Sequence, residues 1–198
     1  MVIRAVVFDI GGVLEITPDL GVDRRWETRL GLPAGEINAR LRDVWQGGSV
    51  GTITLDDVHE ALKDRLGLDD EKLAQFMADL WREYVGTANT ELIEYARRLR
   101  PRYHTGIVSN SFVGAREREK DLVDLVDETV YSHEIGVNKP DPRAFEIACA
   151  RLRSRPGDCL FIDDHSPNVE AARAFGMRAV LFTGNTETTA AIEDFLRP

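Results

Sequence analysis

From about residue 88 onward, strand-like and helix-like segments alternate, and this alternation limits the fold more than any other feature. Apolar segments rich in strand-forming residues occur at 104–108, 128–131, 159–162 and 178–182, and amphipathic segments with helical spacing lie between them. A further β-branched run, at residues 3–8, is bounded by Gly11 and Gly12. Strands alternating with helices predict an α/β fold with a doubly wound, Rossmann-like parallel sheet.

Residues 16–86 show helical patterning alone. Four amphipathic segments fill this region, and the last carries one apolar stripe: Leu73, Phe76, Met77, Leu80, Trp81 and Tyr84. We interpret the stripe as the core of an inserted helical unit rather than as a ligand site. The predicted domains are therefore a core formed by residues 1–15 and 87–198, and an all-helical cap formed by residues 16–86.

A helix connection at residues 47–51 is rich in glycine and follows Trp45 and Gln46. Its expected mobility would suit a hinge or a loop that touches substrate. The simpler interpretation, which we prefer, is a plain connection between two helices with Trp45 packed in the cap core.

Composition excludes several classes of function. The chain has 198 residues, with 25 basic and 34 acidic side chains and a net charge of -9, so no basic surface is expected for nucleic acid or an anionic membrane. No apolar run is long enough to span a membrane, and the start does not resemble a signal peptide. Cys149 and Cys159 lack metal-ligand spacing and are expected to be buried free thiols. We expect a cytoplasmic monomer or homodimer.

Polar residues follow several of the expected strands. Asp9, Ser109 and the pair Asp163 and Asp164 each stand where a strand ends, and Lys139 lies in a later loop. The carboxyl ends of parallel strands share one edge of a sheet, which is where ligands bind in such folds. These residues, distant in sequence, are therefore expected to form one polar site.

The chemistry of this set indicates phosphoryl transfer. Three carboxylates at one edge repel one another unless a cation lies among them, and ligands that are all oxygen favour Mg²⁺. Ser109 and Asn110 can donate hydrogen bonds to phosphate, and Lys139 can neutralise both phosphate and an attacking carboxylate. The set predicts attack on phosphorus by an aspartate, assisted by Mg²⁺.

Four segments carry a family resemblance in their order and spacing: FDIGGV at residues 8–13, VSNS at 108–111, GVNKPDP at 136–142 and FIDD at 161–164. They resemble the four motifs of the haloacid dehalogenase-like (HAD) hydrolases, whose first type of cap is inserted where this chain has its helical region. Within that superfamily the chain looks most similar to small sugar-phosphate phosphatases and to the phosphatase domain fused to epoxide hydrolases.

The resemblance implies a role for each matched residue. Asp9 is implied to be the nucleophile and a metal ligand, and Lys139 to be a cation that stabilises it and binds phosphate. Ser109 and Asn110 are implied to bind phosphate. The backbone of Gly11 and the side chain of Asp164 are implied to bind Mg²⁺ directly, with Asp163 as a second ligand or an outer-shell acid. The substrate implied is a small phosphorylated metabolite.

The chain departs from the family at Gly11. Most phosphatases that it resembles have a second aspartate there, which protonates the leaving oxygen and later activates water; some sugar-1-phosphatase-like members have glycine. A general acid or base contributes roughly 10² to 10⁴ in rate. Candidate substitutes are Glu15, His133 and His165, each of which also has a plain explanation as a surface or capping residue.

Three functions follow from these residues. The first is a Mg²⁺-dependent phosphatase of a small phosphomonoester, with a sugar phosphate as one candidate, working through an aspartyl-phosphate. The second is a 2-haloacid dehalogenase, in which the same aspartate attacks carbon without a metal. The third is a non-catalytic protein that binds a phosphorylated metabolite and has lost its general acid.

Overall fold

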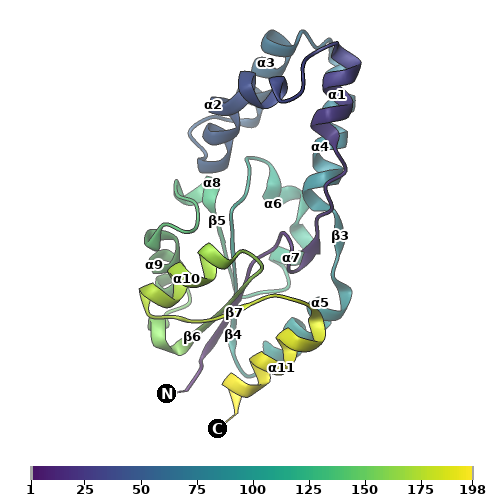
Figure 1. The fold of residues 1–198 in the computed structure, drawn as a ribbon. Helices are drawn as coiled ribbons and strands as arrows, with labels where there is room; N and C mark the ends of the chain where they lie inside the picture. The colour runs from purple at the N-terminus through teal and green to yellow at the C-terminus, as the bar shows by residue number, and fades with distance from the viewer. Residues whose placement is uncertain (1, 198) are drawn as a thin grey trace.

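The computed structural model describes residues 2–197 and confirms the parallel sheet (Figure 1). Its strand order is β5-β4-β1-β6-β7, and every neighbouring pair is parallel. The strands are β1 Ala5–Phe8, β4 His104–Ser109, β5 Glu128–Tyr131, β6 Cys159–Asp163 and β7 Arg178–Leu181. The apolar runs in the sequence therefore form the strands expected of them, with the earliest run at the centre of the sheet.

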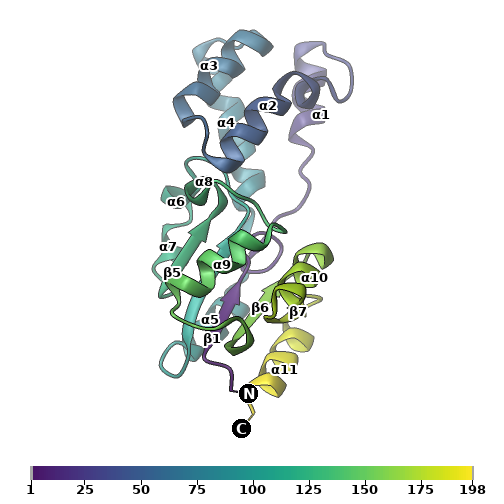
Figure 2. The ribbon, with the colours of Figure 1, turned by 90° about the vertical axis from the view of Figure 1, so that its left-hand side faces the viewer.

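Helices cover both faces of this sheet (Figure 2). On one face Val6 and Phe8 pack with α5 Thr90–Leu99, α7 Lys120–Val123 and α11 Asn185–Leu196. On the other, Ala5 and Val7 pack with α9 Pro142–Arg151 and α10 Ser166–Phe175. Because alternate residues of a strand face opposite sides, one buried strand supplies both apolar layers. None of the described helices combines the length and apolar surface that a membrane crossing requires.

One expected helix is broken. The sequence pattern indicates a continuous amphipathic helix from Arg116 through residues 122–126, but the chain forms two single turns, α6 Ala115–Arg118 and α7 Lys120–Val123. Glu119 lies between them with φ -104° and ψ 23°, and its carboxylate is buried, accepting a 2.5 Å hydrogen bond from Tyr131. Turning this acid inward interrupts the helix. Two more short elements, α8 Ser132–Ile135 and η1 Pro156–Asp158, lie in later connections.

The helical region packs around its own apolar cluster, beyond the carboxyl ends of the strands (Figure 1). Its helices are α1 Val22–Leu30, α2 Glu36–Val50, α3 Leu55–Leu66 and α4 Asp70–Val85. Thr54 caps α3 in a capping box with Asp57, as the spacing indicates. The chain enters and leaves this region through a short antiparallel ribbon, in which β2 Glu15–Ile16 pairs with β3 Thr87–Ala88.

The glycine-rich residues 47–51 are not the connection between two helices that we preferred. Residues 47–50 are the last turn of α2, which docks on the core. A Cβ on Gly48 would lie 2.2 Å from the ring of Phe112, and one on Gly51 would lie 1.8 Å from the carbonyl oxygen of His133. Glycine is needed here because the two parts of the chain approach closely.

We expect Gly51→Ala to destabilise the protein more than the matched change Gly67→Ala. Both glycines end cap helices, at φ +68° and +69°, but the space around Gly67 is open. The strained backbone should cost about 1 kcal/mol in each variant, and the clash with His133 roughly 1–3 kcal/mol more in Gly51→Ala. Urea denaturation of the two variants measures the difference. Equal losses of unfolding free energy would contradict close packing of Gly51 against the His133 carbonyl.

Candidate functional site

Three neighbouring strands bring the polar residues together. Phe8, the last residue of β1, pairs with Ile107 of β4 and Ile162 of β6. Asp9 follows β1 directly, and its backbone N–H donates to the carbonyl of Ile162 at 2.8 Å. Ser109 and Asp163 are the last residues of the two flanking strands, so all three side chains start from the same edge of the sheet.

Lys139 joins two of the acids. Its Nζ lies 2.8 Å from Asp9 Oδ1 and 2.7 Å from Asp163 Oδ2, and all three side chains are largely shielded from solvent. Asn110 fixes the lysine: its Oδ1 accepts from Lys139 N at 2.6 Å, and its Nδ2 donates to Lys139 O at 2.9 Å. The side chain of Asn110 therefore holds the loop that carries the cation, while the Ser109 hydroxyl makes only a long 3.5 Å contact.

The two adjacent acids have different surroundings. Asp163 is fully buried and accepts hydrogen bonds from Lys139, from Asn168 Nδ2 and from the His165 backbone. Asp164 is exposed, and a Cβ on Gly12 would lie 2.1 Å from its Oδ2, so its carboxylate rests on the loop after Asp9. Asn168 is a site residue that the sequence analysis missed, although an amide in the first turn after an acidic pair is a usable signal.

Crowded carboxylates make this site suitable for a cation. Oxygens of Asp9, Asp163 and Asp164 lie within 4.8 Å of one another. Burial raises the pKa of Asp9 to about 7, against the opposing effect of Lys139, and burial followed by the charge of Asp163 raises the pKa of Asp164. One lysine faces three acids, and the donors are all oxygen, which fits Mg²⁺.

Gly11 leaves open space where a side chain would project. A Cβ there would meet nothing closer than the Thr17 side chain, at 4.0 Å. Gly11 lines a cavity of about 360 Å³ together with Ser109, Asn110 and Glu15. Of the three candidate substitutes for the missing acid, Glu15 is thus beside this position.

The two histidines among the candidates are placed differently. His133 Nδ1 lies 2.6 Å from the hydroxyl of Ser111, and His165 is exposed at the start of α10. Neither residue lines the cavity that contains Gly11 and Ser109.

Glu15 and Glu119 form a buried acidic pair in this cavity. Burial and the nearby charge of Glu119 raise the pKa of Glu15 to about 8, and burial raises the pKa of Glu119 to about 7. Glu15 Oε2 is buried without a hydrogen-bond partner among the described residues. The pair therefore holds at least one proton at neutral pH. Glu119 was missed by sequence reasoning because its pattern indicated the solvent face of a helix.

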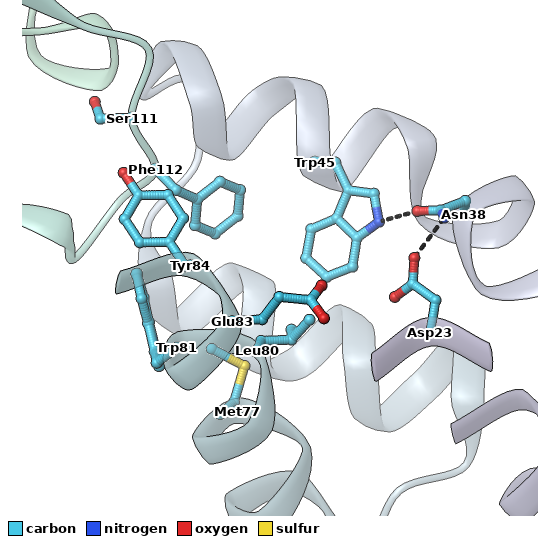
Figure 3. A pocket seen from close by; sticks show the side chains of 10 residues that line it. All are labelled: Asp23, Asn38, Trp45, Met77, Leu80, Trp81, Glu83, Tyr84, Ser111 and Phe112. Atoms are coloured by element: carbon cyan, nitrogen blue, oxygen red, sulfur yellow. Dashed lines mark hydrogen bonds between the residues drawn. The ribbon is translucent and has the colours of Figure 1, made fainter. Parts of the chain in front are cut away.

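A second cavity, of about 350 Å³, lies between the cap and the loop after β4 (Figure 3). Met77, Leu80, Trp81 and Tyr84 line it. The apolar stripe of α4 is therefore divided: Phe76 is fully buried in the cap core, as interpreted from the sequence, but Met77, Leu80, Trp81 and Tyr84 line a cavity.

Comparisons with known proteins agree with this geometry. The family model for haloacid dehalogenase-like hydrolase matches residues 3–176. Phosphatase MT3486 of Mycobacterium tuberculosis is 32% identical, with 95% of this chain and 91% of the relative covered. D-ribitol-5-phosphate phosphatase of Bacteroides thetaiotaomicron is 26% identical, with 88% and 89% covered. A HAD family enzyme of B. thetaiotaomicron, solved with magnesium and inorganic phosphate, has the same fold, with a TM-score of 0.77, 20% identity, and 92% and 96% of the two chains covered.

We expect Glu119→Gln to flatten the dependence of stability on pH. The folded protein binds the Glu119 proton more tightly than the unfolded chain does, so this group's contribution is present below its ordinary pKa of 4.5 and is lost as pH rises through about 7. Between about pH 5 and pH 8, the free energy of unfolding should fall by roughly 1–3 kcal/mol less in the variant than in the wild type. Urea denaturation across this range measures it.

Glu117→Gln is the matched control, because Glu117 is an exposed acid two positions away. It should keep the wild-type slope. A Glu119→Gln protein with that same slope would contradict the assignment of a proton to the buried pair.

Proposed function

The chain belongs to the haloacid dehalogenase-like hydrolase family, and from this premise we propose that it is a Mg²⁺-dependent phosphatase that hydrolyses a small phosphomonoester through an aspartyl-phosphate. The observation that carries the proposal is the buried lysine between two acids: Lys139 lies 2.8 Å from Asp9 and 2.7 Å from Asp163. The names of the relatives, phosphatases in both cases, support the same reaction. The free, buried thiols support our assignment to the cytoplasm.

In this proposal Asp9 attacks phosphorus while Lys139 offsets the repulsion between the carboxylate and the phosphate. Ser109, whose hydroxyl has no short partner, donates to a phosphate oxygen, and the bond from phosphorus to the leaving oxygen breaks. Water then attacks phosphorus, which releases inorganic phosphate and restores Asp9.

Asp9, the Gly11 carbonyl and Asp164 would hold Mg²⁺, which when bound would neutralise phosphate charge. We assign Asp163 to the outer shell, because its oxygens already accept from Lys139, Asn168 and the His165 backbone.

We assign protonation of the leaving oxygen to Glu15. It lines the same cavity as Gly11 and Ser109, and one of its oxygens lacks a partner. In the first step its proton passes to the leaving oxygen, and in the second its carboxylate accepts a proton from the attacking water.

A dehalogenase is the second candidate, since its nucleophile would also be Asp9. The acids that surround Asp9 argue against it: without a metal, Lys139 alone would face three carboxylates whose oxygens lie within 4.8 Å. Full turnover of a 2-haloacid in EDTA would favour the dehalogenase. Tight binding of a phosphate analogue without any turnover would favour the non-catalytic protein.

We expect Asp9→Asn to abolish phosphate release while the fold survives. The amide keeps the size of the carboxylate but cannot attack phosphorus, so release from phenyl phosphate should fall at least about a thousandfold. Phosphate release with Mg²⁺ and with EDTA, together with thermal unfolding, checks this. Substantial turnover by a folded Asp9→Asn protein would rule out the covalent route.

We expect Glu15→Gln to slow the first step, measured as release of the leaving alcohol in a single turnover, by roughly 10² or more for alkyl phosphates. Phenyl phosphate should be slowed much less in this step, because a phenol leaves without full protonation. Adding Gly11→Asp should restore the rate on alkyl esters, since the open space at Gly11 admits the new acid.

Gly11→Asn is the matched control for this rescue, because it fills the same space without a proton to give. It should restore nothing in the Glu15→Gln background. Equal losses of the single-turnover rate of alcohol release for both classes of ester, or rescue by asparagine, would contradict proton transfer from Glu15 to the leaving oxygen.

A further inference from the structure

The cavity under the cap adjoins the proposed phosphate site. Glu83 and Tyr84 line both this cavity and the one that contains Gly11 and Ser109. The loop after β4 runs from one to the other, because Ser109 borders the cavity that contains Gly11, and Ser111 and Phe112 border the cavity under the cap. A substrate whose phosphate meets Asp9 can therefore extend its alcohol part beneath the cap.

Aromatic rings from three elements form the wall of this cavity (Figure 3). The centre of the Phe112 ring lies 5.8 Å from that of Trp45 and 6.4 Å from that of Trp81. The ring centres of Trp81 and Tyr84 are 5.3 Å apart. Trp45 is held in place by a hydrogen-bonded chain: its Nε1 donates to Asn38 at 3.1 Å. This hydrogen bond fixes the position of the Trp45 ring without a ligand.

The charged groups of the cavity are all acidic. Asp23 and Glu83 line it, and none of the Lys, Arg or His side chains among residues 2–197 does, although the Arg118 guanidinium lies 3.8 Å from the centre of the Trp81 ring. Asp23 accepts a 2.6 Å hydrogen bond from Asn38. Burial, followed by the charges of Glu83, Glu27 and Asp19, raises the pKa of its carboxylate. Glu83 accepts only a 3.3 Å hydrogen bond, from the backbone of Val22. Two carboxylates without a basic partner disfavour any second anionic group on the substrate.

We propose that the alcohol part of the substrate bears an ammonium group, which the aromatic wall and the carboxylates of Asp23 and Glu83 receive. Faces of tryptophan and tyrosine attract cations, and such cages recognise quaternary ammonium groups. A second phosphate or a carboxylate would need arginine or lysine there. The inference rests on the proposed phosphatase function and names its substrate class, in preference to a sugar phosphate.

A series of three alkyl phosphates of equal size tests this class. At the end opposite the phosphate, the alkyl chain carries a trimethylammonium group, its neutral tert-butyl isostere, or a carboxylate. We expect kcat/KM for the ammonium ester to exceed that of the neutral one by about tenfold or more, and the carboxylate to be the poorest substrate. Equal values for the charged and neutral esters would overturn the inference.

Variants assign the preference to this cavity. Glu83→Gln keeps an acceptor for Val22 but removes the charge, and should reduce the ratio of ammonium to neutral ester to near one. Asp64→Asn removes an exposed cap acid outside the cavity and should leave the ratio at its wild-type value. A ratio that falls equally in both variants would point to the overall charge of the cap instead, and would overturn the assignment.

Binding separates this inference from the proposed reaction. In Asp9→Asn, calorimetry with Mg²⁺ should show the same order of affinity for the three esters without any turnover, and the fluorescence of Trp45 and Trp81 should respond to the ammonium ester. Preferential binding in a protein that hydrolyses none of the esters would support the inference and reject the phosphatase. Hydrolysis of all three esters by the wild type without preference would support the phosphatase and overturn the inference of an ammonium substrate.

Discussion

The buried contact of Lys139 with Asp9 and Asp163 is the interaction on which the rest of the site depends. Removing charged groups from water costs several kcal/mol for each ion, and a buried pair persists only with close geometry and additional hydrogen bonds. Asn110 supplies these to the lysine backbone, and Asn168 supplies them to Asp163. Adjacent parallel strands fix the starting points of the two acids, so the cation sits between them at 2.8 and 2.7 Å.

This arrangement leaves an excess of negative charge at the sheet edge. Asp164 joins the two paired acids within 4.8 Å, and its position over Gly12 depends on the absence of a side chain there. Burial raises the pKa of Asp9 to about 7. Binding of either a proton or a cation near Asp9 therefore lowers the energy of the site. Asp9, the Gly11 carbonyl and Asp164 would hold a divalent cation, whose charge would keep Asp9 ionised as the nucleophile.

Much of the fold and part of the site could be predicted from the sequence. The apolar runs and the glycines and polar residues that follow them predict the strands, and the polar residues at the ends of three of these strands follow from the same pattern. Glu119 could not be found in this way, since its local sequence indicates a surface helix and only the contact with Tyr131 turns it inward. The glycines of residues 47–51 indicate mobility by composition, whereas they serve close docking against Phe112 and His133.

The cap cavity could not be predicted for a related reason. The residues of the α4 stripe have the same chemistry and spacing whether they face a core or a void. Phe112, which belongs to the loop after β4, lines the cavity with them, and its ring centre lies 6.4 Å from that of Trp81. Long-range placement of this kind has no signal in a local pattern.

The central claim is that Asp9 itself carries the phosphoryl group. The most direct test is mass spectrometry of the peptide containing Asp9 after turnover with phenyl phosphate and Mg²⁺ and an acid quench. Because Glu15 is assigned to activate water in the second step, we expect the phosphorylated peptide in the wild type and more of it in Glu15→Gln. Phosphate release with no phosphoryl group on Asp9, or with one on another residue, would contradict the claim.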